Sequence, residues 1–151
     1  MKKKQVIKAI EYAQEYHLQQ MEKVSLLVSG KKVKNPTPKS KDACEFGGWL
    51  YGEASRIKKL LGIQFYKSMD LIHEYWHLQY EKIYNIYYDD EEDGIFNKLL
   101  GHRKKLSAEE HQEVQDIYSS LEQATDDLME ALSASKRRII ALKERVFEEI
   151  D

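Results

Sequence analysis

The stretch from Ser107 to Ile150 contains neither glycine nor proline, and no other feature constrains the fold as strongly. Ser107 and Glu110 have the spacing of a capping box at its start. Mostly apolar side chains then recur in alternating steps of four and three, the heptad spacing of one helix face: Val114, Tyr118, Leu121, Thr125, Leu128, Leu132, Ser135, Ile139, Leu142 and Val146. We therefore predict one long C-terminal helix over residues 107–150.

Such a helix would be longer than anything else in the chain. At 1.5 Å per residue it extends about 60 Å, whereas helices of 20 to 28 residues reach only about 30 to 40 Å. The surplus is expected to pack on a second copy of the chain or on a partner. The alternative is that the helix bends or breaks near "SASK", residues 133–136, and folds onto its own bundle.

Three shorter helices are predicted before it, over residues 2–29, from Ser40 or Asp42 to about Leu61, and over residues 63–88. Each of the first two is followed by a glycine, which is a common stop signal, and both prolines lie in the basic loop between them. The acidic run of residues 89–94 ends the third, and a short piece at 96–100 leads to the last helix. The predicted fold is all-α: a four-helix bundle with a long C-terminal helix, dimeric, and a single domain over residues 1–151.

Charge and cysteine content exclude several classes of protein. The 24 basic and 26 acidic residues leave a formal net charge of −2, so the one-signed field of a nucleic-acid binder is absent. The single cysteine forms no internal disulfide, which favours a reducing cytoplasm. The N-terminus begins with lysines but lacks the apolar segment of a signal peptide, and no run approaches the roughly 20 apolar residues of a membrane span. We expect a cytoplasmic protein.

The motif "HEYWH" places His73 and His77 four residues apart on one face of the third helix. Their Cβ atoms are then about 5–6 Å apart, which allows two imidazoles to bind one ion. Histidine pairs at this spacing also occur by chance on helix surfaces. This pair lies on the apolar stripe between Met69 and Tyr80, where unpaired imidazoles need a partner. A metal ion would satisfy both.

Two further residues complete a set of ligands. His17 lies on the apolar side of the first helix, and Cys44 is the only thiol of the chain. Taken alone, His17 is more simply interpreted as a core histidine that is hydrogen-bonded to a neighbour. Cys44 alone is more simply interpreted as a small buried hydrophobic residue. One cysteine and three histidines nevertheless make a complete tetrahedral shell for Zn²⁺, and they come from three different predicted helices. We predict a zinc site of His17, Cys44, His73 and His77.

The run "DACEFGGWLYG" places two glycines close after that cysteine. We expect Cys44 in the first turn of the second helix, where the helix dipole favours the thiolate. Gly47 and Gly48 then omit side chains on the same side as the sulfur, which lets the histidine-bearing helices approach, and Trp49 closes the site against water. The alternative is that the glycines only mark a frayed helix start.

Together these motifs resemble the chemoreceptor zinc-binding (CZB) domain of bacterial signalling proteins. The family signature is a His, then Cys-x-aromatic-Gly-x-Trp, then His-x-x-x-His, which here corresponds to His17, "CEFGGW" and "HEYWH". The resemblance spans roughly residues 10–90. One departure is Gln19, where the family usually has an aromatic residue or leucine, and this makes His17 the least secure ligand.

The resemblance implies a zinc-bound four-helix bundle, usually a homodimer, that acts as a cytosolic sensor. Family members are attached to chemoreceptors or to enzymes that make cyclic dinucleotides, and in some of them hypochlorous acid oxidises the zinc-bound cysteine. A filled Cys-His₃ shell leaves no open position for water, so the chain is not expected to be an enzyme. Asp42 and Asp70 are candidate acceptors around the ligands, although both positions favour solvent.

The sequence is also compatible with two other functions. A hemerythrin-like bundle would bind iron or oxygen through histidines and bridging carboxylates, but no convincing set of carboxylates accompanies the five histidines. A metal-free helical adaptor would use the tyrosines, clustered as "IYNIYYDD", for packing or for binding another protein.

Overall fold

The computed structural model describes residues 1–88 and 105–150, and within them the regular structure is entirely α-helical. The long helices are α1 (Lys3–Val28), α5 (Ile63–Tyr87) and α7 (Ala108–Ala141). The short ones are α2 (Glu45–Tyr51), α3 (Glu53–Arg56), α4 (Lys58–Leu61) and α8 (Arg145–Glu148). The all-α class and the long C-terminal helix are thus confirmed. The acidic turn at 89–94 and the short piece at 96–100 lie outside the described residues.

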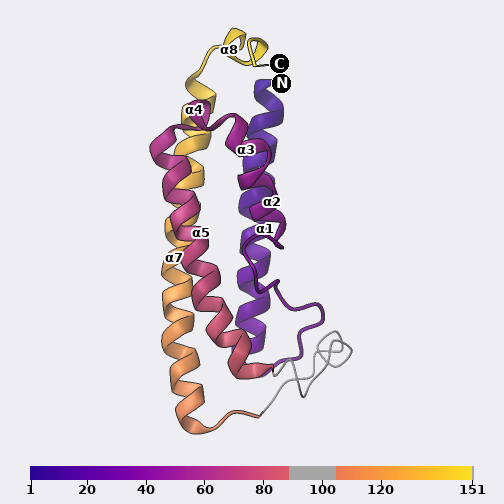
Figure 1. Cartoon of the computed structure of the whole chain (residues 1–151), viewed down its shortest axis with the longest axis vertical. Helices are drawn as coiled ribbons and strands as arrows, with labels where there is room; N and C mark the ends of the chain where they lie inside the picture. Colours follow the sequence, from indigo (N-terminus) through magenta and orange to yellow (C-terminus); the bar gives the residue numbers. More distant parts are fainter. Residues whose placement is uncertain (89–104, 151) are drawn as a thin grey trace.

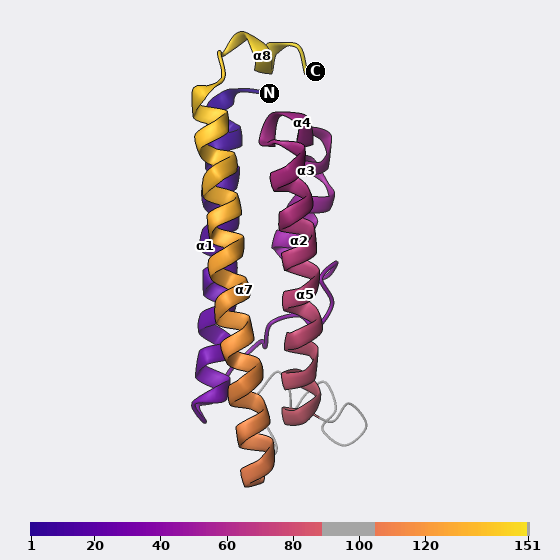
Figure 2. The same ribbon diagram turned by 90° about the vertical axis from the view of Figure 1, so that its left-hand side faces the viewer.

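The three long helices run side by side, and α7 packs against both α1 and α5 (Figures 1 and 2). The predicted apolar stripe of α1 is buried along its whole length. α1 ends just before Gly30, and Gly62 precedes α5; both glycines have positive φ values, 88° and 96°, which other residues rarely adopt. The boundaries of α1 and α5 therefore follow the predicted signals.

The second predicted helix is wrong as a continuous element. The chain from Glu45 to Leu61 instead forms α2, α3 and α4, which lie beside α1 and α5 (Figure 2). It turns at Gly52, where an added Cβ would lie 2.7 Å from the carbonyl oxygen of Gly48. Side chains of α7 satisfy backbone carbonyls at the end of α4: Ser135 Oγ donates to Leu61 and Arg138 Nε donates to Leu60. Contacts with α7 thereby satisfy two carbonyl oxygens that the end of a helix leaves without an intrahelical partner.

The predicted end of the last helix is also wrong. The capping box of Ser107 and Glu110 forms as expected, and α7 continues without a break through residues 133–136. It stops at Ala141, where Lys3 Nζ donates to the carbonyl oxygens of Ile140 (2.6 Å) and Leu142 (2.8 Å). α8 then crosses the same end of the molecule as the N-terminus (Figure 1). The end of the predicted helix thus folds back onto its own chain as the alternative prediction described, but the break follows Ala141 and not residues 133–136.

The buried apolar residues form two clusters along the bundle. One contains Cys44, Phe46 and Met69 with the α7 residues from Leu128 onward, and the other contains Trp76 and Tyr80 with the α7 residues up to Ala124. Buried polar side chains lie at the level between them, among them His17, His73 and Thr125. Trp76 Nε1 donates to Thr125 Oγ1 at 3.0 Å, so the buried hydroxyl of α7 and the buried indole N–H of α5 are hydrogen-bonded to each other.

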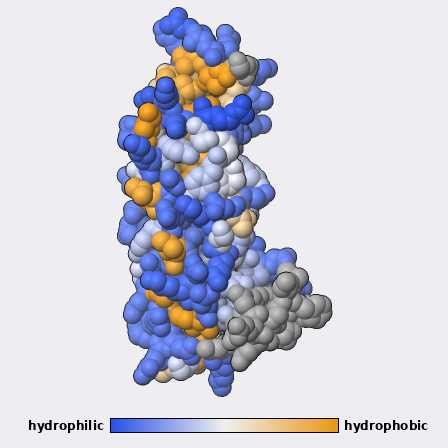
Figure 3. All heavy atoms as spheres, in the orientation of Figure 1, coloured by the Kyte–Doolittle hydropathy of each residue, from blue (hydrophilic) through white to orange (hydrophobic). Residues whose placement is uncertain are grey.

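The face shown in Figure 3 is mainly hydrophilic, with separate apolar patches along α5 and α7. Among the helices in residues 1–88 and 105–150, none combines the length and apolar character that crossing a bilayer requires.

The packing of α8 predicts a large effect of Phe147→Ala. The Phe147 side chain is completely buried among apolar residues, so its truncation should lower the free energy of unfolding by about 3–5 kcal/mol. Denaturant unfolding followed by circular dichroism measures the change. Ile140→Ala, at a position that is 51% exposed, serves as the matched control and should change stability by less than about 1 kcal/mol. Equal effects of the two substitutions would contradict the docking of α8.

Candidate metal centre

Cys44 caps the N-terminus of α2 with its own sulfur. Its backbone is extended (φ −89°, ψ 150°), and Sγ accepts a hydrogen bond from the Gly47 amide at 3.2 Å. The thiol is directed toward the Lys41 carbonyl oxygen, 3.4 Å away. Cys44 is therefore the capping residue and not a first-turn residue as predicted. This position fixes the sulfur against both the helix start and the preceding loop.

His73 and His77 of α5 reach the same place from the opposite side. His73 Nε2 lies 3.1 Å from Cys44 Sγ, and the ligand atoms of Cys44, His73 and His77 all lie within 4.8 Å of one another. All three side chains are buried. In a tetrahedral zinc shell with Zn–S near 2.3 Å and Zn–N near 2.0–2.1 Å, ligand atoms are roughly 3.3–3.6 Å apart. Small movements of these three side chains would therefore bring their ligand atoms to the distances of a tetrahedral metal site.

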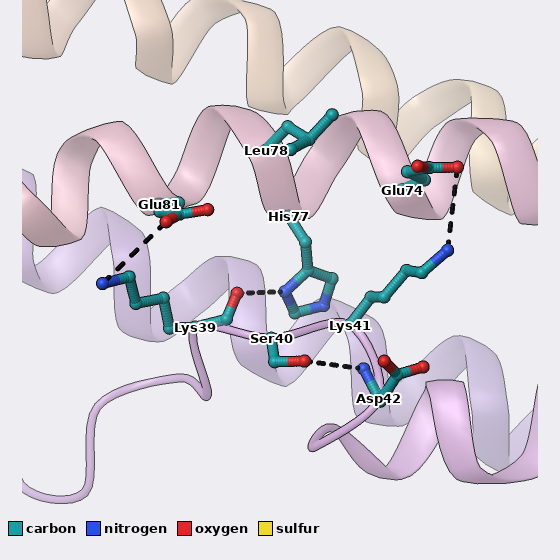
Figure 4. A pocket seen from close by; sticks show the side chains of 8 residues that line it. All are labelled: Lys39, Ser40, Lys41, Asp42, Glu74, His77, Leu78 and Glu81. Carbon is teal, nitrogen blue, oxygen red and sulfur yellow. Dashed lines mark hydrogen bonds and ion pairs between the residues drawn. The ribbon is translucent and has the colours of Figure 1, made fainter.

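A loop segment covers His77, and we call residues 37–43 the strap. His77 Nδ1 lies 3.2 Å from the Lys39 carbonyl oxygen (Figure 4). Because a carbonyl only accepts, Nδ1 must carry the proton, which leaves Nε2 with the lone pair that a metal needs. The strap is anchored at Thr37, which donates to Gln20 Oε1 (2.9 Å) and accepts from Tyr80 Oη (2.8 Å) through its carbonyl oxygen. The strap thus fixes the orientation of the His77 imidazole, although no strap residue belongs to the group of Cys44, His73 and His77.

His17 lies beside this three-residue group but is not part of it. Its side chain is 1% exposed, and neither ring nitrogen has a hydrogen-bond partner. The ring centroid is 5.8 Å from that of His73 and 4.8 Å from that of Trp76. The structure therefore brings together three of the four predicted ligands and places the fourth next to them. Leaving a buried polar group unpaired costs about 1–3 kcal/mol, so this imidazole is in an unfavourable state without a partner.

Burial holds the three imidazoles neutral. Desolvation lowers the pKa of His17 to about 3, of His73 to about 2 and of His77 to about 4, with nearby histidines adding to the shift for the first two. Burial also raises the pKa of the Cys44 thiol, which the Gly47 amide partly offsets. Neutral imidazoles are the form that binds a metal, whereas the thiol must lose its proton to become a ligand.

The structure revises the roles expected for the two glycines and Trp49. A Cβ at Gly47 would lie 1.9 Å from the Lys41 carbonyl oxygen and 3.4 Å from His73 Cε1, so this glycine makes room mainly for the strap. A Cβ at Gly48 would meet nothing within 4 Å. Trp49 is half-buried against Phe46, and Trp76 is the indole that lies against His17 and His77.

Sequence reasoning missed the groups around the ligands. The Lys39 and Lys41 carbonyls belong to a loop for which no contact was predicted, and backbone acceptors leave no signal in residue types. The two prolines flanking Thr37 stiffen this loop and could have indicated a fixed path into Cys44. Of the two predicted acceptors, Asp70 accepts from Tyr51 Oη (2.9 Å) and Asp42 is exposed.

A pocket of 380 Å³ opens between the strap and α5 beside His77 (Figure 4). Two ion pairs span it: Lys39 with Glu81 (3.9 Å) and Lys41 with Glu74 (3.6 Å). Both pairs join exposed or half-exposed side chains, so each contributes little to stability. The pocket brings solvent close to the candidate centre without exposing its ligand atoms.

Residues 17–84 of the chain match the family model of the chemoreceptor zinc-binding domain, CZB. The matched segment begins at His17 and includes Cys44, His73 and His77. The resemblance predicted from the motifs is thereby confirmed over this segment. Comparison with curated proteins and with solved structures gave no match.

Gly47→Ala and Gly48→Ala form a matched pair that tests the contact between the strap and α2. The first substitution forces backbone atoms apart and should destabilise the protein by about 1–3 kcal/mol, with at least tenfold weaker zinc binding. The second has free space and should stabilise α2 by up to about 1 kcal/mol without changing zinc binding. Thermal unfolding and zinc titration measure both effects. Identical behaviour of the two variants would show that the strap does not pack as described.

The lowered pKa values predict acid sensitivity of the metal-free protein. Between about pH 6.5 and pH 4 the unfolded chain binds protons at these histidines that the folded chain excludes, so stability falls as the pH drops below about 6.5. Each histidine contributes a slope of up to roughly 1.4 kcal/mol per pH unit. Urea unfolding at pH 6.5 and pH 5.0 measures the slope. His17→Leu should reduce it by about a third, and an unchanged slope would contradict the burial of a neutral imidazole.

Proposed function

Because residues 17–84 match the chemoreceptor zinc-binding family, we propose that this chain is a zinc-binding sensory domain whose ion is held by His17, Cys44, His73 and His77. The observation that carries the proposal is the convergence of one buried thiol and two buried imidazoles from α2 and α5. Sulfur and imidazole nitrogen form a donor set that suits zinc. Among the described residues, this group contains no carboxylate, which disfavours a hemerythrin-like iron centre.

The orphaned His17 supports its assignment as the fourth ligand. It comes from α1, and its buried nitrogens have no other partner. A rotation of its ring toward His73 would satisfy one nitrogen with the metal and add a link between α1 and α5. The ion would then join three parts of the chain that are far apart in sequence.

A shell filled by four protein ligands favours regulation over catalysis. It leaves no open position for a water molecule, so metal-assisted hydrolysis has no site. The signal would be either the level of zinc or the oxidation of Cys44. With hypochlorous acid, the oxygen is transferred to the thiolate sulfur and chloride leaves, which yields a sulfenic acid and weakens the zinc–sulfur bond.

The strap is the element that would respond first. As a thiol, Cys44 has a proton to donate to the Lys41 carbonyl oxygen, but as a zinc-bound thiolate it has none. Loading, loss or oxidation of the site therefore changes the bonding of the strap, while the bond from His77 to Lys39 persists. The output would pass through a homodimer or through contacts with a chemotaxis or cyclic-dinucleotide signalling protein in the cytoplasm.

Elemental analysis of purified protein tests the ligand assignment. We expect one zinc per chain in the native protein, near-complete loss in Cys44→Ala, His73→Gln and His77→Gln, and weaker retention in His17→Gln. His111→Gln, at an exposed position on α7, is the control and should keep full occupancy. Full zinc in Cys44→Ala would refute the assignment. Iron with a visible absorption band would favour the hemerythrin-like alternative.

Absence of metal, combined with an unchanged melting temperature in Cys44→Ala, would favour the metal-free adaptor. Both the native protein and the Cys44→Ala variant are purified without chelators for these measurements.

A further inference from the structure

A buried hydrogen-bonded group lies beside the candidate metal centre and is not part of its ligand set. Thr37 Oγ1 donates to Gln20 Oε1 of α1 at 2.9 Å, and Tyr80 Oη of α5 donates to the Thr37 carbonyl oxygen at 2.8 Å. None of the three residues is more than 5% exposed. We call Gln20, Thr37 and Tyr80 the Thr37 bridge, because a residue of the strap joins two long helices through them.

The Thr37 bridge lies about one helical turn from the predicted ligands on both helices. On α1, Gln20 follows His17 by three residues. On α5, Tyr80 follows His77 by the same interval. The two helices run in the same direction (Figure 1), so both contacts lie on the same side of the centre, about 4.5 Å further along the bundle. The bridge thus joins α1 and α5 close to the imidazoles that the ion would link.

The separation of α1 and α5 depends on what lies between them. α7 packs closely against both helices, whereas α1 and α5 approach each other less closely. A hydrogen bond restricts its two heavy atoms to a narrow range of distances, and it is stronger in the protein interior than in water. Zinc is equally restrictive, since its bonds to imidazole nitrogen measure about 2.0–2.1 Å. A bridge that fixes the separation of the helices would therefore favour binding by ligands from both.

The chain around Thr37 is stiff, so a change in its position is transmitted to His77. Pro36 and Pro38 flank Thr37. A proline ring fixes φ at about −65° and confines the preceding residue to extended backbone. Lys39 follows directly, and its carbonyl oxygen lies 3.2 Å from His77 Nδ1. A shift of Thr37 would therefore displace the acceptor that fixes the orientation of this imidazole.

We propose that Thr37 is a positioning residue of the metal centre, which sets the affinity for the ion by holding the helices of His17 and His77 at ligand distance. This inference rests on the proposed function, because it presupposes that these ligands bind zinc. Loss of an outer-shell partner lowers metal affinity by about 10–100-fold in other metal sites. The simpler interpretation is that the polar groups of the Thr37 bridge only satisfy one another in the core, which predicts a loss of stability alone.

Zinc affinity of the full-length chain, measured by competition with a chromophoric chelator, tests the proposal. Thr37→Val keeps the shape of the side chain but removes the hydroxyl, and it should weaken zinc binding by about tenfold or more. Thr37→Ser retains the hydroxyl and should bind zinc like the wild type. Ser135→Ala is the matched control, because it removes a different buried hydrogen bond, to the Leu61 carbonyl oxygen. It should lower the melting temperature without changing zinc affinity.

A double substitution separates positioning from stability. Gln20→Met with Thr37→Val replaces both partners by apolar groups of similar shape, which removes the unpaired oxygen and should restore much of the melting temperature. Zinc affinity should nevertheless stay about tenfold or more below that of the wild type. Tyr80→Phe removes the other bond of the bridge and leaves Thr37 unchanged. It should also weaken zinc binding and alter the visible absorption spectrum of the Co²⁺-loaded protein, which reports the ligand geometry.

Wild-type zinc affinity in both Thr37→Val and Tyr80→Phe would overturn the positioning role. Recovery of zinc affinity together with the melting temperature in the double variant would overturn it as well, because stability alone would then explain the loss. A native protein that binds no zinc would overturn the proposed function and the positioning role with it. Tight zinc binding that is insensitive to the Thr37 bridge would overturn the positioning role only.

Discussion

Burial of nitrogen and sulfur donors at the middle of the bundle is the constraint on which the rest of the structure depends. His17, His73 and His77 lie in the core between the two apolar clusters, next to Cys44 at the edge of one of them. Neutral imidazoles without partners are costly there, and the unpaired nitrogens of His17 show the deficit directly. Binding one cation would convert that cost into a cross-link between α1, α2 and α5. Structural zinc sites contribute to folding in this way, so metal occupancy and stability should be coupled.

In the function that we propose, the strap would transmit a change at the centre to the surface of the molecule. Its backbone carbonyls face the Cys44 thiol and the His77 imidazole, while Thr37 fixes it to α1 and α5 through Gln20 and Tyr80. Protonation or oxidation of the Cys44 sulfur would therefore directly alter its hydrogen bond to the Lys41 carbonyl oxygen of the strap. Such a local bonding change is the kind of event on which switches are built.

α5 connects the candidate metal centre with the surface of the molecule. One side carries His73 and His77 into the core, and another presents Leu71, Tyr75 and Leu78 to solvent. Tyr75 lies between the two histidines in sequence, so the buried and the exposed side chains belong to the same turns of one helix.

The sequence alone determined the apolar stripes of α1, α5 and α7, the capping box at Ser107, the helix ends at Gly30 and Gly62, and the candidacy of the four ligands, because each depends on residue type and short-range spacing. It could not show that Cys44 is a helix cap, that α2 gives way to α3 at Gly52, or that α7 ends at Ala141. Two contacts over long sequence separations shape the ends of these elements, Lys3 with the end of α7 and Arg138 with the end of α4. The Cys44 cap is local, but it depends on backbone groups, the Gly47 amide and the Lys41 carbonyl. Only the packed chain brings these groups together, and backbone acceptors such as the Lys39 carbonyl carry no mark in the residue pattern.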